Sequence, residues 1–216
     1  ELEQGKTIVM LPQAGGWFEV EVACPAGTLY RFNIDGENTV PDPASRAQAL
    51  DVHGWSRVVD PLAYQWRHSQ WQGRPWHTAI IYELHVGAMG GYAGVEKHLP
   101  RLAELGVTAI ELMPLAQFPG ERNWGYDGVL PYAPHATYGT PEQLKQLIDS
   151  AHGHGLAVIL DVVYNHFGPD GNYLGQYAQG FFQEDVHTPW GAGIDFERRE
   201  VRDFFLDNAL MWLLEY

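Results

Sequence analysis

Short stretches in which apolar and polar positions alternate occupy the start of the chain. Residues 7–10, 17–22 and 29–34 each show part of this two-residue period, which is typical of β-strands, and turn signals separate them. About three strands are too few to form an independent sandwich. The sequence therefore predicts that residues 1–40 are part of an antiparallel β-sandwich whose first strands lie upstream.

Residues 41–78 follow no regular period. They carry four Pro residues and four of the eight Trp residues of the chain. Trp side chains bury large apolar surfaces, so a stretch with four of them is expected to pack rather than to move freely. The sequence predicts a packed linker between two domains.

Longer apolar runs mark the remaining residues, 79–216. Runs at 79–86, 107–113 and 156–163 are typical of strands. The third run is apolar except for Asp161, as expected of a strand that is buried on both faces.

Apolar residues recur at helical spacing between and after these runs, which predicts helices over 95–105, 141–153 and 198–214. Pro100 weakens the first helix, and Thr140 is a plausible N-cap of the second. Alternating strands and helices predict an α/β domain with parallel strands and right-handed crossovers.

Two long loops, 114–139 and 164–197, follow the second and third predicted strands. Three strands fit either an open doubly wound sheet or an eight-stranded barrel. Long loops without regular structure are usually functional, and in a barrel they lie on the active face, at the carboxyl ends of the strands.

Composition narrows the classes of partner. The formal charge of −14 would repel nucleic acid, and no apolar run approaches the roughly 20 residues of a membrane span. Cys24 is the only cysteine, which fits a reducing compartment, and a cytoplasmic location is expected. Eleven Tyr and eight Trp provide flat faces on which sugar rings can pack, although most aromatic residues serve a core.

The most informative segment is 161–166, where an apolar strand ends in polar side chains. Asp161 needs a buried or ionic partner, and His166 could donate hydrogen bonds to a neutral ligand. A structural network explains the same residues equally well.

A second segment, 123–128, places Trp124 and Tyr126 between glycines, next to Asn123 and Asp127. Aromatic faces beside an amide and a carboxylate suit a sugar. A turn with its aromatic side chains folded inward is the alternative.

The order of three motifs resembles the α-amylase family. They are YELHVG at 82–87, NWGYD at 123–127 and DVVYNH at 161–166, the last matching the first signature region of that family. Further resemblance lies in FGPDGNYL at 167–174, TPWG at 188–191, YRF at 30–32 and PDPASR at 41–46. The resemblance implies the N-terminal part of a (β/α)8 barrel, about three strands long, preceded by part of a β-sandwich.

The same resemblance implies roles for individual residues. Tyr126 would stack on the glucose at the cleavage site, with Trp124 and Asp127 as further substrate contacts. His166 would bond hydroxyls of that glucose. Two supporting residues are implied as well: Asp161 would orient a downstream Arg, and Asn165, a calcium ligand in many amylases, is expected to be structural here.

The catalytic carboxylates of the family are expected beyond Tyr216, because the nucleophile lies in an Arg-x-Asp pattern on the fourth strand. No Arg of this chain is followed two positions later by Asp. The chain is therefore predicted to stop before the fourth strand and to be inactive alone.

The implied partner is an α-1,4-linked gluco-oligosaccharide ending in trehalose, which the full enzyme would hydrolyse. A glycogen branching enzyme, which transfers the chain instead, and a non-catalytic α-glucan-binding module are the alternatives. No metal and no cofactor are expected: His152 and His154 point about 200° apart on a helix and cannot readily share an ion.

Overall fold

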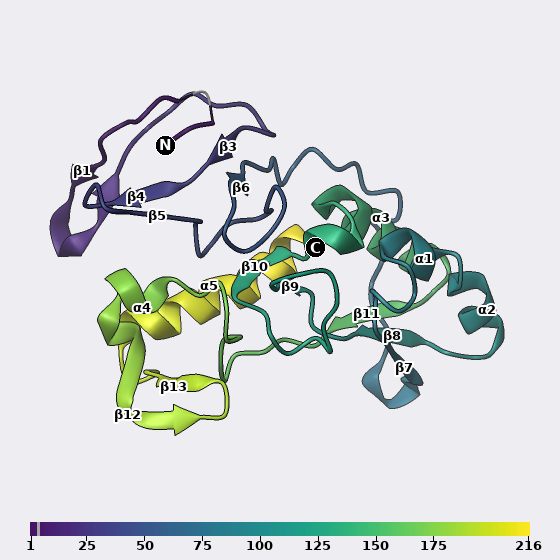
Figure 1. Cartoon of the computed structure of the whole chain (residues 1–216). Helices are drawn as coiled ribbons and strands as arrows, with labels where there is room; N and C mark the ends of the chain where they lie inside the picture. The colour runs from purple at the N-terminus through teal and green to yellow at the C-terminus, as the bar shows by residue number, and fades with distance from the viewer. Residues whose placement is uncertain (4) are drawn as a thin grey trace.

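Short antiparallel strands form the first part of the computed structural model, which describes residues 1–3 and 5–216. They are β1 (Leu11–Pro12), β2 (Phe18–Glu19), β3 (Leu29–Tyr30), β4 (Phe32–Ile34), β5 (Asn38–Val40) and β6 (Ser56–Arg57), with a 3-10 turn, η1 (Ala14–Gly16). The pairs are β1 with β2, β3 with β6 and β4 with β5. Figure 1 shows this group apart from the larger sheet of the molecule.

The strand predicted at 7–10 is wrong. A strand needs a hydrogen-bonded neighbour, and within the described stretch around it only β1 has one, namely β2 across η1. The run 17–22 shortens to β2 for the same reason. Two strands, β3 and β4, replace the single one predicted at 29–34.

A hairpin that the periodicity missed joins β4 and β5. Asp35 and Gly36 both have positive φ, 53° and 80°, and the Glu37 N–H donates to the Ile34 carbonyl at 3.0 Å. Asp-Gly is a preferred pair for such a two-residue turn. β6 lies within the segment expected to be a packed linker, so that segment contributes to the β structure of the first region.

Three parallel strands form the larger sheet: β7 (Ile81–Leu84), β8 (Ala109–Leu112) and β11 (Ala157–Leu160). Their order is β11-β8-β7, and both pairs are parallel, as predicted. Among the described residues, β7 and β11 each pair on one side only, and the sheet is not closed. β11 is half-buried rather than buried on both faces.

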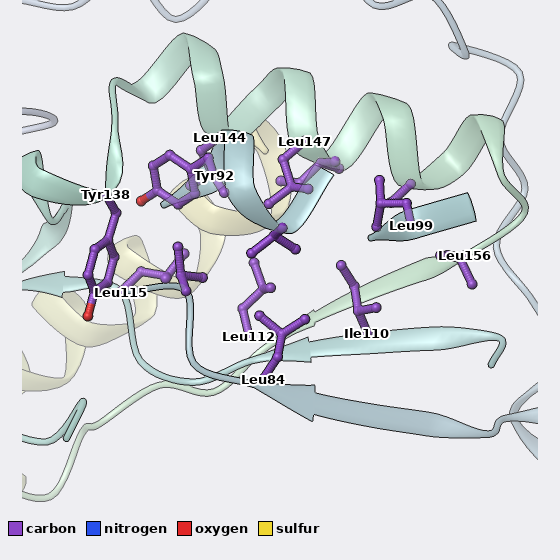
Figure 2. Close-up of a cluster of buried hydrophobic side chains, with 14 of the residues drawn as sticks. Leu84, Tyr92, Leu99, Ile110, Leu112, Leu115, Tyr138, Leu144, Leu147 and Leu156 are labelled. Atoms are coloured by element: carbon purple, nitrogen blue, oxygen red, sulfur yellow. The ribbon is translucent and has the colours of Figure 1, made fainter. Parts of the chain in front are cut away.

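One face of this sheet packs on helices α1 (Tyr92–Glu96), α2 (Leu99–Glu104) and α3 (Pro141–Gly153). In Figure 2, Leu144 and Leu147 of α3 point toward Leu84 and Leu112 on the strands. The predicted helix 95–105 is two helices. Pro100 falls in the first turn of α2, where its missing N–H costs nothing, so a new helix begins there.

The beginning of α3 confirms the N-cap that the sequence predicts. The Thr140 hydroxyl accepts from the Gln143 N–H, and the Gln143 side chain accepts from the Thr140 N–H. This capping box satisfies two amides that the helix itself leaves without partners.

The two long loops contain secondary structure that periodicity did not predict. Their elements are β9 (Ala116–Gln117), β10 (Leu130–Pro134), η3 (Ala136–Tyr138), α4 (Leu174–Tyr177), η4 (Gln179–Phe181), β12 (Phe182–Thr188) and β13 (Gly191–Ile194). α5 (Arg199–Glu215) follows, as predicted, and packs with these loops in a second core that includes Phe167, Phe181 and Phe205.

A buried carboxylate ties the segment before η2 (Trp76–Thr78) to α3. Asp149 accepts hydrogen bonds from the Tyr64 hydroxyl, from the backbone and side chain of Arg67, and from the backbone and Nδ1 of His68, at 2.9 to 3.1 Å. Burial acts to raise the pKa of Asp149, but these donors outweigh it and hold the pKa well below its usual value. Trp71 stacks on His152 beside this contact.

None of the helices in the described part of the chain has the length and hydropathy that a membrane crossing requires.

Candidate functional site

The loop at 123–128 is held by its own first side chain. The Asn123 amide accepts a hydrogen bond from the Gly125 N–H through Oδ1 and donates to Asp127 Oδ2 at 2.8 Å through Nδ2. Gly125 has a φ of 108°, which a residue with a side chain rarely adopts. The folded loop leaves Trp124 85% exposed and Tyr126 39% exposed. Both aromatic faces are therefore open to a ligand, and the inward-folded alternative is excluded.

His166 reaches this loop from the end of the third strand. Its Nε2 lies 2.8 Å from the Tyr126 carbonyl oxygen, so Nε2 donates, and its Nδ1 lies 3.0 Å from Oδ1 of Asn165. The ring is only 6% exposed. The structure thus brings together His166, Asn165 and Tyr126, with His166 fixing the backbone that carries the Tyr126 ring.

The Trp190 ring stacks on one face of the His166 imidazole. The two rings stack with centroids 4.1 Å apart and an angle of 22°. Trp190 lies in the turn between β12 and β13, and the Thr188 hydroxyl accepts a hydrogen bond from its N–H. Its segment contributed to the family resemblance, but a place in the site was not assigned to it, because the hairpin that carries it has no clear period.

The two long loops touch where a glycine allows it. The Gly168 N–H donates to the Gly128 carbonyl at 3.1 Å, and a Cβ at Gly168 would clash with the Asp127 carbonyl. The segment after His166 therefore closes tightly on the aromatic loop only because residue 168 has no side chain.

Asp161 begins the polar segment after β11. Burial, and next the negative charge of Glu83, raise its pKa above the usual value. Glu83 is in register with Glu111 on the neighbouring strand. Among the described residues none forms a hydrogen bond or ion pair with the Asp161 carboxylate, so this half-buried acid lacks the partner that the sequence predicts for it.

Tyr164 anchors the same segment to α5. Its hydroxyl donates to Oδ1 of Asn208 at 2.6 Å, and the Asn208 amide donates to the Pro131 carbonyl at 3.0 Å. Asn208 is fully buried. This link joins α5 to both long loops, and no periodicity in the sequence indicates it.

The described side chains contain no group of three or more His, Cys, Asp and Glu residues arranged for a metal ion. Two exposed aromatic side chains beside an amide and a carboxylate are groups that can recognise a neutral polar ligand.

Comparison with known proteins agrees with this geometry. Residues 45–211 match the family described as alpha amylase, catalytic domain. A malto-oligosyltrehalose trehalohydrolase from Deinococcus radiodurans is 46% identical over 215 residues, covering 98% of this chain and 36% of that protein. A 1,4-alpha-glucan branching enzyme from Pseudomonas fluorescens is 35% identical, covering 88% of this chain and 30% of its own length.

A solved structure shows the same fold. The crystal structure of a Salmonella typhimurium protein ascribed to the alpha amylases has a TM-score of 0.93 and 52% identity, covering 96% of this chain and 36% of that one. The chain spans about a third of the length of the proteins it matches.

Proposed function

Because the chain belongs to the α-amylase family, we propose that it is part of a retaining enzyme that hydrolyses the α-1,4 bond next to a terminal trehalose unit. The observation that carries this proposal is the cluster of Tyr126, His166 and Trp190, which joins both long loops around two exposed aromatic faces. The trehalohydrolase relative is the more similar of the two named enzymes, at 46% against 35% identity.

In this proposal each loop residue has a defined task. Tyr126 stacks on the glucose at the cleavage site, while Trp124 and Asp127 contact the same oligosaccharide. His166 keeps Tyr126 in place through the Tyr126 carbonyl, and its Nδ1, which lies 3.0 Å from Oδ1 of Asn165, is proposed to bond a hydroxyl of the same glucose. No cofactor or metal takes part in the proposed reaction.

The chemical step needs two carboxylates about 5 Å apart, one to attack the anomeric carbon and one to act as acid and then base. We propose that both lie on later strands. The Asp161 carboxylate then orients an Arg beside the attacking carboxylate, which fits its lack of a partner among the described residues. The 216-residue chain by itself is expected to release no product.

The later strands are proposed to complete a (β/α)8 barrel. The groove beside β11 has a volume of about 490 Å³ and is lined mainly by apolar side chains from β11, α3 and α5, such as Leu160, Ile148 and Trp212. Leu213 and Leu214 on α5 are 78% and 81% exposed. A fourth strand pairing with β11 would cover this surface.

Product analysis of the longer enzyme tests the function. Given a maltooligosaccharide that ends in trehalose, the enzyme is expected to release free trehalose, and the purified 216-residue chain none. New branch points without trehalose would establish the rival branching activity, which the Pseudomonas fluorescens relative supports. Binding of the oligosaccharide without any turnover by the longer protein would leave a glucan-binding module.

The location of the enzyme stays a prediction. A cytoplasmic enzyme would appear in the soluble fraction of intact, washed cells and would be absent from the culture medium.

A further inference from the structure

We propose that His85 is a positioning residue for the aromatic loop at 123–128 and that it acts on this loop as a pair with His166. His85 follows β7, the first strand of the sheet, and His166 follows β11, the third. Each imidazole reaches a main-chain carbonyl of the loop that lies between these strands in the sequence. The inference rests on the proposed function, since that function gives the loop its sugar-binding task.

The turn after β7 determines which nitrogen of His85 carries the proton. The Ala88 N–H donates to Nδ1 of His85 at 3.1 Å. An atom that accepts this bond holds no proton, so the neutral ring carries its proton on Nε2. That nitrogen lies 2.7 Å from the Asn123 carbonyl oxygen and donates to it. The backbone turn thus prepares the imidazole as a donor aimed at the loop.

The second donor acts three residues further along the loop. Nε2 of His166 donates to the Tyr126 carbonyl at 2.8 Å. Within the same loop the Asn123 side chain binds the Gly125 N–H and, just after the second point, the Asp127 carboxylate. The backbone is therefore fixed at both ends and across its middle, while the Trp124 ring stays exposed.

The surroundings of His85 favour this role over simple packing. A Cβ at Gly87 would lie 2.7 Å from the Tyr138 ring and 3.0 Å from the His85 ring, so the two rings can pack this closely on the turn only because residue 87 has no side chain. The Tyr138 hydroxyl lies 3.5 Å from Nε2 of His85. The Tyr138 ring packs edge-on against the His85 imidazole, with the two ring centroids 6.0 Å apart. A residue that only fills space would not need a nitrogen atom facing the Ala88 N–H or the Asn123 carbonyl.

Three substitutions separate the two bonds of His85. His85→Gln places an amide donor near the position of Nε2 and can keep the bond to Asn123. His85→Asn places an amide oxygen near Nδ1 and can keep only the bond from Ala88. His85→Phe keeps the ring shape and neither bond. His98→Gln is the matched control, because His98 is exposed and its side chain does not cap α2.

Kinetics of the longer enzyme on the trehalose-ended oligosaccharide give the first readout. His85→Phe and His85→Asn are expected to raise KM about tenfold with kcat changed less than about threefold, since a stacking contact acts on the bound ground state and the transition state alike. His85→Gln is expected to stay within about threefold of wild type. Equal loss in His85→Gln and His85→Phe, or no loss in His85→Phe, would overturn the proposal.

Hydrogen exchange without any ligand gives the second readout. Amide protection across residues 121–128 is expected to fall in His85→Phe and His85→Asn, and to remain in His85→Gln and His98→Gln. This measurement needs no turnover, so it tests the clamp even if the enzyme releases no trehalose. Unchanged protection in all four variants would show that His85 does not hold the loop.

Discussion

At the scale of single residues, the candidate site depends on side chains that act through the backbone of their neighbours. The polar atoms of His166 and Asn123 form hydrogen bonds that hold the aromatic loop. The rings of Trp124 and Tyr126 stay exposed and are available to bind a ligand. Substitutions of residues that touch the ligand and of residues that shape the loop are therefore expected to have different effects.

Gly168 is the position where the two long loops come closest. Gly168→Ala is expected to lower the free energy of unfolding by roughly 2 kcal/mol, because the new methyl group must push the Asp127 carbonyl away. Thermal unfolding of the longer enzyme measures this. Gly175→Ala is the control, since a Cβ there would have its nearest neighbour at 4.0 Å, an ordinary contact. Equal effects of both substitutions would contradict the close approach.

Trp190 should affect substrate binding because its ring stacks on His166. Trp190→Ala is expected to raise KM for the oligosaccharide about tenfold, because His166 loses its stacked neighbour and the site loses an aromatic face, while Trp190→Phe should retain most of the affinity. Steady-state kinetics check both. Trp76→Ala removes an indole that is 75% exposed on η2 and is expected to leave KM unchanged. A similar effect of Trp76→Ala would point to a general loss of folding instead.

At the scale of elements, the local signals of the sequence were sufficient for some parts and not for others. The helix α3 and its cap at Thr140 could be predicted because a capping box and one apolar face lie within a few neighbouring residues. The strands β9, β10, β12 and β13 could not, because both pairs have an interrupted register, which breaks the regular alternation along the sequence. The sequence predicted that His166 lies near Tyr126, and the structure agrees, but it did not indicate the contacts of Trp190 and His85, whose partners are distant in the sequence.

The contact between Asp149 and the segment before η2 should make the free energy of unfolding decrease at low pH. The folded-state pKa of Asp149 lies below its unfolded value, so its contribution is present above the unfolded value of 3.8 and is lost as the pH falls below it. Asp149→Asn is therefore expected to lower the melting temperature at pH 7 and to flatten its decline between about pH 5 and pH 2.

The size of this effect follows from the loss of the negative charge and of the bonds to the one oxygen that becomes an NH2 group, since the remaining amide oxygen can still accept. At pH 7 the loss is roughly 3 kcal/mol. Glu104→Ala, an exposed residue of α2, serves as the control and should change the melting temperature little. A parallel decline of wild type and Asp149→Asn with falling pH would show that the carboxylate titrates normally in the folded chain.

At the scale of the whole molecule, the segment 41–78 between the first region and the parallel sheet also contacts later parts of the chain. Arg46 pairs with Glu215 near the end of α5 at 3.1 Å, and His53 reaches Tyr173 and Asp170 in the loop after β11 at 2.6 and 3.4 Å. This segment, which also carries β6 of the first region, therefore contacts both the last helix and a loop of the candidate site. A change in this region is expected to reach the site through the loop at 167–174.

The one-sided pairing of β7 and β11 carries a consequence for the chain in isolation. A strand with exposed amide and carbonyl groups is a template for another copy, and charged residues are the usual protection. Here β11 is entirely apolar, and the leucines of α5 lie exposed nearby. The purified 216-residue chain is expected to self-associate as its concentration rises, which sedimentation velocity would detect. Ile159→Lys, which puts a charge in the middle of β11, should suppress the aggregates.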